Sequence, residues 1–130
     1  MYVLDTNTLI YYFKGMGNVA DKLLQTAPRD IAIPAVVLYE LEVGLAKSNN
    51  SKKRQEQLDD FIALITVLPM GIEEAKAAAN IRAALEVKGT PIGAIDTLIA
   101  GIALANQGVL VTHNTKEFSR VQGLMFEDWF

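Results

Sequence analysis

Short apolar runs alternate along the chain with longer segments in which apolar residues recur at helical spacing. Short apolar runs are typical of buried strands, and the longer periodic segments are typical of helices that cover a core. Strands are expected at residues 2–4, 31–33, 66–68 and 109–111, with a last edge strand at 124–126. Helices are expected at residues 6–13, 18–27, 35–46, 51–65, 72–87 and 95–105. The alternation predicts an α/β fold, a three-layer sandwich in which helices flank a mainly parallel sheet of short strands.

Proline, glycine and polar residues separate these segments. Gly15 ends the first helix, Pro28 closes the second, Pro34 starts the third, and the polar residues 47–50 break the chain before the fourth. These breaks are loops and not domain linkers. We therefore expect residues 1–130 to form one domain, which is large enough to bury a core without disulfides.

The composition excludes several classes of protein. The absence of cysteine removes disulfides, thiolate catalysis and cysteine-zinc sites. No basic and apolar leader and no long apolar stretch is present, so we expect a soluble protein of the cytoplasm. Twelve basic against fifteen acidic residues give a net charge of -3, which argues against binding of nucleic acid by bulk charge. Any action on nucleic acid would require acidic side chains that gather divalent cations.

Four acidic residues occupy places where an ordinary surface acid is not expected. Asp5 follows the first strand, and Glu117 lies in the segment that follows the strand at 109–111. The carboxyl ends of parallel strands share one edge of a sheet, so these two acids are expected to converge. Glu40 lies within an otherwise apolar helix, and Asp96 lies at the start of another. Each acid alone has a simpler explanation as a helix cap or a solvated residue, and only the combination indicates a site.

Such a combination suits a hard divalent ion. Magnesium and manganese prefer oxygen ligands, and a few carboxylates leave positions open to water and to a substrate phosphate. The ion would lower the pKa of a bound water and neutralise charge in the transition state of phosphodiester hydrolysis. Without the ion, neighbouring carboxylates repel one another and at least one should titrate high.

Several stretches of sequence together resemble the VapC-type toxins of the PIN-domain family. They are VLDTN at residues 3–7, ELEVG at 40–44, PIGAIDTLIA at 91–100, LVTHN at 110–114, and Glu117-Phe118. The resemblance covers essentially the whole chain. It implies a PIN-like fold, a Mg²⁺ or Mn²⁺ cofactor, and endoribonuclease activity on structured RNA, often transfer RNA. It also implies a VapB-type antitoxin as partner.

The resemblance also implies roles for single residues. Asp5, Glu40 and Asp96 match the core acids of the family. Glu117 is our choice for the less constant fourth position, with Asn114 as its rival. The remaining matches are Thr6, Asn7 and Thr112. They are small polar positions that support the acids, a bound water or the substrate by hydrogen bonds. Many relatives carry histidine where this chain has Ile102, so any role of that histidine is absent here.

Other side chains have two interpretations. His113 is the only histidine and could act as a general acid, although a structural role is favoured. Basic side chains could guide RNA, although a solvated surface is favoured slightly; they are Lys47, Lys52, Lys53, Arg54, Lys116 and Arg120. The aromatic residues Tyr11, Tyr12, Phe13 and Trp129 are assigned to packing and not to base stacking.

The Glu40 helix is apolar on more than one face. Its residues Tyr39, Leu41, Val43 and Leu45 suggest a partner surface in addition to a core surface, and a homodimer is the expected use. An antitoxin peptide could also lie along such helices and place a basic side chain among the carboxylates.

Two other classes of function compete with a nuclease. An acidic pocket at strand ends also suits a phospho-acceptor or nucleotide-binding domain, but the first strand is not followed by the paired acids expected there. The fold could also serve as a catalytically silent scaffold for partner binding, which the intact acids disfavour.

Overall fold

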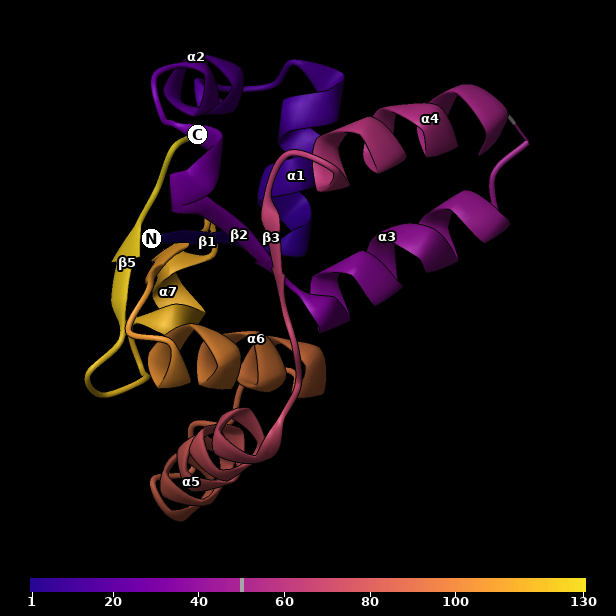
Figure 1. Ribbon diagram of the computed structural model, residues 1–130. Coiled ribbons are helices and arrows are strands. Elements are labelled where there is room, and N and C mark those ends of the chain that lie inside the picture. The colour runs from indigo at the N-terminus through magenta and orange to yellow at the C-terminus, as the bar shows by residue number, and fades with distance from the viewer. Residues whose placement is uncertain (50) are drawn as a thin grey trace.

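A five-stranded parallel sheet forms the centre of the protein (Figure 1). The computed structural model describes residues 1–49 and 51–130, so residue 50 of the predicted break at 47–50 lies outside the described residues. The strands are β1 (Tyr2–Leu4), β2 (Ile31–Pro34), β3 (Thr66–Leu68), β4 (Val109–Val111) and β5 (Met125–Glu127). Their order is β3-β2-β1-β4-β5, and every neighbouring pair is parallel. The prediction of an α/β fold is confirmed.

Helices cover both faces of the sheet. Within the described residues they are α1 (Thr6–Lys14), α2 (Val19–Leu24), α3 (Ala35–Ala46), α4 (Ser51–Ile62), α5 (Ile72–Val87), α6 (Ala94–Ala105) and α7 (Thr115–Phe118), with a 3₁₀ turn η1 (Pro28–Asp30). In Figure 1, α1 and α2 lie on one side of the sheet, α5 and α6 lie on the other, and α3 and α4 form a hairpin that projects beyond it. The strand order reverses between β3 and β4, and right-handed crossovers therefore place α5 and α6 on the second face.

Most element bounds follow the prediction, and the differences have local causes. The helix expected at 18–27 ends at Leu24, where the Thr26 hydroxyl donates to the Lys22 carbonyl and replaces a further helical turn. The helix expected at 51–65 ends at Ile62, because the next residues turn directly into β3. Among the described residues, no helix combines the length and the apolar composition that a membrane span requires.

The core is continuous through the sheet. Val3 and Leu4 of β1 and Leu110 and Val111 of β4 are fully buried, as expected for central strands covered on both faces. Ile102 is also fully buried.

The aromatic residues Tyr12, Phe13 and Phe61 pack against one another, and Trp129 packs against Tyr2. This agrees with a packing role.

The helices α5 and α6 approach each other closely. Gly101 of α6 faces Ala78 of α5, and a Cβ added at Gly101 would lie 2.6 Å from the Ala78 Cβ. Glycine is needed here because the two helix backbones leave no room for a side chain. This contact holds α6, whose first turn carries Asp96, against α5.

Candidate active site

Asp5 lies where β1 passes into α1 and is held from several sides. Its main-chain N–H donates to the Val111 carbonyl at 3.2 Å, which ties it to the end of β4. Its Oδ1 accepts from the Thr8 N–H at 2.9 Å, so Asp5 caps α1, as one interpretation of the sequence expected. The Thr112 hydroxyl also bonds its carboxylate. Asp5 is only 5% exposed, so a buried acid is fixed at the carboxyl edge of the sheet.

Glu40 approaches from α3, the helix that follows β2. The Thr6 hydroxyl donates to its Oε1, which links the first turn of α1 to the middle of α3. Glu40 is half-buried, so it does not simply point into solvent. Asn7, next to Thr6, is exposed. Its supporting or substrate-binding role stays a prediction.

Asp96 and Glu117 form the second half of the cluster. Asp96 lies in the first turn of α6 but does not cap it, because Gly93 is the capping residue. Glu117 lies in α7 and shares a hydrogen bond with Asp96. The Asn114 Nδ2 donates to the Glu117 Oε2 at 2.9 Å. The two candidates for the fourth position therefore lie side by side and have different roles. Glu117 contacts Asp96, and Asn114 orients Glu117.

Acids from four separate elements lie close enough to affect one another's ionisation. The pKa of Asp96 is raised to about 6, first by burial and then by the negative charges of Glu117, Asp5 and Glu40. Burial also raises the pKa of Asp5, against the lowering effect of hydrogen bonds from Thr112 and Thr8, and Glu40 adds to the rise. In the described part of the chain, no cation is among the groups that shift these two pKa values. The cluster therefore carries negative charge that the protein itself does not neutralise.

The donors suit a hard divalent ion without forming a closed cage. Among the described residues, no three acidic or histidine side chains already stand around one point closely enough to hold an ion. The acids nevertheless act on one another's pKa values, so they share one pocket. Magnesium commonly binds through one or two carboxylates and keeps water and substrate phosphate as its other ligands. The chemistry of this oxygen-only set fits that kind of site.

The other residues singled out in the sequence lie around the cluster. His113 pairs with Asp128, Nδ1 to Oδ2 at 2.8 Å, and its ring stacks on Phe130, which agrees with the structural interpretation. Arg120 donates to the Pro91 carbonyl at 3.1 Å. Lys52 and Lys53 are exposed on α4, and a role for them in guiding RNA stays a prediction.

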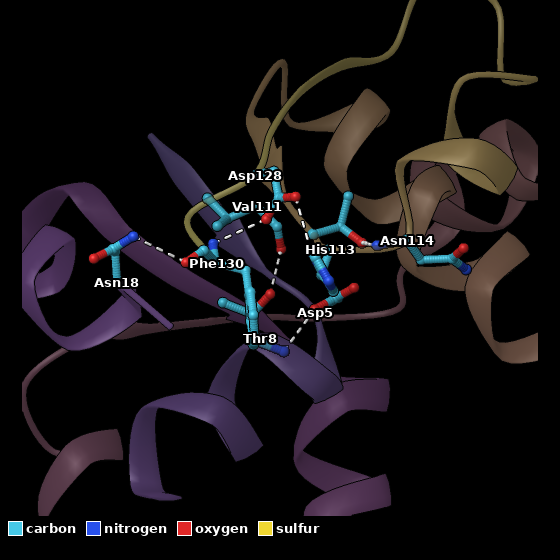
Figure 2. Close-up of polar contacts among 9 residues, drawn as sticks. Asp5, Thr8, Asn18, Val111, His113, Asn114, Asp128 and Phe130 are labelled. Atoms are coloured by element: carbon cyan, nitrogen blue, oxygen red, sulfur yellow. Dashed lines mark hydrogen bonds and ion pairs between the residues drawn. The ribbon is translucent and has the colours of Figure 1, made fainter. Parts of the chain in front are cut away.

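Thr8 was not among the predicted site residues, although it holds Asp5 in place. Its hydroxyl donates at 3.0 Å to the same Val111 carbonyl that accepts from Asp5, and its N–H binds the Asp5 carboxylate (Figure 2). The available signal was its place three residues after a capping aspartate. The contacts of Asp128 and Phe130 were also missed, and no pattern in the sequence pointed to them.

The chain is similar to known proteins over nearly its whole length. The model of the PIN domain family matches residues 2–124. The chain is 34% identical to the ribonuclease VapC2 of Rickettsia felis, covering 99% of this chain and 98% of that protein. It is also 34% identical to the tRNA(fMet)-specific endonuclease VapC of Salmonella typhimurium, covering 98% and 97%. The crystal structure of VapBC2 from Rickettsia felis bound to a DNA fragment from their promoter contains a chain with a TM-score of 0.92 at 35% identity, covering 99% of this chain and 98% of that one.

The chain belongs to the PIN-domain family, because the family model matches it over nearly its full length. Its parallel sheet has carboxylates gathered at the carboxyl edge. Within that family it is a ribonuclease of the VapC toxin type, as the full-length relatives are.

Proposed function

We propose that this ribonuclease holds Mg²⁺ or Mn²⁺ with Asp5, Glu40, Asp96 and Glu117 and hydrolyses phosphodiester bonds of structured RNA. The observation that carries the proposal is the gathering of four carboxylates from four elements in one pocket, where Glu117, Asp5 and Glu40 all act on Asp96. Asp5 also caps α1, but that role does not require Glu40, Asp96 and Glu117 to lie near it, and the repulsion among the four carboxylates disfavours the folded state. A bound cation gives that reason.

Each supporting residue has a part in this scheme. When bound, the ion would supply a water molecule of lowered pKa and would neutralise charge on the phosphate. Thr8 and Thr112 hold Asp5, Thr6 holds Glu40, and Asn114 holds Glu117. These hydrogen bonds fix the carboxylate oxygens toward the pocket before substrate arrives, which lowers the cost of ordering them. Asn7 is exposed and follows Thr6 in the sequence, and it is proposed to contact the substrate.

The substrate class comes from the relatives. One of them is named a tRNA(fMet)-specific endonuclease, and we propose transfer RNA in the cytoplasm as the first substrate to test. To find the substrate, the protein is expressed briefly, newly formed RNA ends are sequenced, and the same is done for Asp96→Asn. New ends that appear only with the wild type identify the RNA and the bond that is cut.

The central test uses the acids. Asp5→Asn and Asp96→Asn are expected to abolish Mg²⁺-dependent RNA cleavage and toxicity in cells, since each removes a charged oxygen ligand and keeps the side-chain volume. Asp30→Asn is the matched control, because Asp30 is exposed at the amino end of β2, the edge of the sheet opposite the site. Equal cleavage by wild type and Asp96→Asn would refute the proposal.

A groove beside the site is the proposed place of an antitoxin. It has a volume of roughly 330 Å³ and runs between α1, α3 and α4, with Glu40 on its wall. The other lining residues are Ile10, Phe13, Lys14, Leu41, Gly44, Leu45, Arg54, Gln57 and Leu58. An apolar peptide segment fits such a wall, and a basic side chain at its end would meet the carboxylates. A complex in which the antitoxin stays far from Asp5 and Asp96 would contradict this proposal.

A further inference from the structure

The segment after β5 folds back over the α1–α2 loop and forms a clasp, defined here as Asn18, His113, Asp128 and Phe130 (Figure 2). The main-chain N–H and the Nδ2 of Asn18 both donate to the Phe130 carbonyl, at 2.8 and 3.1 Å. Asp128 accepts from the Phe130 N–H at 2.9 Å through Oδ1 and contacts the His113 Nδ1 at 2.8 Å through Oδ2. The rings of Phe130 and His113 stack with their centroids 4.3 Å apart. The clasp thus joins three separate segments of the chain.

The clasp is closely fitted. Gly17 has a φ of +64°, and a Cβ added there would lie 2.7 Å from the Phe130 carbonyl oxygen, so both the backbone and the space require glycine. Tyr11 presents its ring edge-on to Phe130 and to His113, with centroid distances of 4.9 and 5.9 Å. The clasp therefore has one defined arrangement and is not a loose tail.

His113 connects the clasp to the active site, because the residues before and after it in the sequence both form hydrogen bonds with carboxylates of the site. Thr112, before it, bonds Asp5 and accepts from the Asn114 N–H at 3.0 Å. Asn114, after it, donates to Glu117. The Thr112 N–H also donates to the Glu127 carbonyl of β5 at 2.9 Å, just before Asp128. Residues 112–114 are thus held on one side by the clasp and bind two acids on the other.

We propose that the clasp is a positioning device for the carboxylate site. By holding His113 from outside, it keeps Thr112 and Asn114 directed at Asp5 and Glu117, and so sets how tightly those acids bind a divalent ion. His113 and Asp128 are positioning residues that act through these neighbours. This inference rests on the proposed function, since it assigns a further determinant of metal binding to the same site.

The test measures Mn²⁺ binding to the full chain by titration calorimetry without RNA. Asp128→Ala breaks both hydrogen bonds of Asp128, and we expect Mn²⁺ affinity about tenfold weaker, the lower end of the loss seen when a partner behind a metal ligand is removed. Asn18→Ala removes one of two donors to the Phe130 carbonyl, and a smaller loss in the same direction is expected. Thermal unfolding of each variant shows that it is folded at the temperature of the titration.

Two control variants separate positioning from charge. Asp128→Asn keeps an acceptor for the Phe130 N–H and a hydrogen-bonding group for His113, and it should restore nearly the wild-type affinity. If Asp128→Asn binds Mn²⁺ as weakly as Asp128→Ala, the effect is one of charge and the inference is overturned. Asp30→Ala removes an exposed carboxylate from the opposite edge of the sheet and should leave affinity unchanged. Equal affinities of Asp128→Ala and Asp30→Ala would overturn the inference alone, whereas a wild type that neither binds Mn²⁺ nor cleaves RNA would overturn the proposed function with it.

Discussion

Asp96 carries a carboxylate whose negative charge the folded protein does not neutralise. Its pKa of about 6 lies above the ordinary value of 3.8, because burial and three other acids oppose its ionised form. Above pH 6 the carboxylate is charged in a half-buried pocket without a cation from the protein. The folded state therefore carries a penalty that a bound ion would relieve.

Replacing this carboxylate should stabilise the metal-free protein. Asp96→Asn removes the charge and keeps the volume, so at pH 7.5 in EDTA the free energy of unfolding should rise by about 1 to 2 kcal/mol, a figure reduced for partial solvent exposure. Denaturant unfolding of the two proteins measures the difference. A less stable Asp96→Asn would mean that the carboxylate is satisfied by the protein itself.

The pH dependence of that difference has a definite sign. A raised pKa means that the folded state binds the proton more tightly than the unfolded state, so Asp96 contributes most stability below pH 4, and this is lost as the pH rises through about 6. In EDTA, the stability of the wild type relative to Asp96→Asn should fall between pH 4 and 7. Unfolding curves across this range measure it, and a constant difference would contradict the raised pKa.

The contact between α5 and α6 offers a test with a matched control. Gly101→Ala places a methyl group against Ala78 and should lower the free energy of unfolding by about 1 to 3 kcal/mol. Gly44→Ala makes the same change inside α3, where nothing lies within 4 Å of the added Cβ, and should raise stability by about 0.5 to 1 kcal/mol. Thermal or denaturant unfolding compares the two, and similar effects would show that the helices can separate at no cost.

The sequence alone predicts the regular helices and strands well, but it does not predict the contacts made by irregular segments. Strands such as β4 and helices such as α3 and α5 were predicted with their bounds, because their apolar spacing is set by burial in the same layers that the structure contains. The convergence of Asp5 and Glu117 followed from the shared edge of parallel strands. The hydrogen bond from Asn114 to Glu117 and the clasp did not follow, because both depend on side-chain directions in short, irregular segments. Local periodicity carries no information about such contacts.

The outer side of α3 is expected to form a homodimer. Tyr39 is 61% exposed and Val43 is 36% exposed, next to the groove proposed for the antitoxin. Apolar surface of this kind is costly to leave in water. Tyr39→Glu is expected to convert the dimer to a monomer, as measured by light scattering after size-exclusion chromatography. A wild type that is already monomeric would contradict the prediction.

The central position of β1 has a consequence for synthesis of this enzyme. β1 pairs with β4, and Asp5 shares its pocket with Asp96 and Glu117, so the pocket can form only after the chain has been made as far as Glu117. A half-made polypeptide holds Asp5 and Glu40 but lacks the other two acids. If these four acids form the site as proposed, a nascent chain that ends before Asp96 cannot cut RNA.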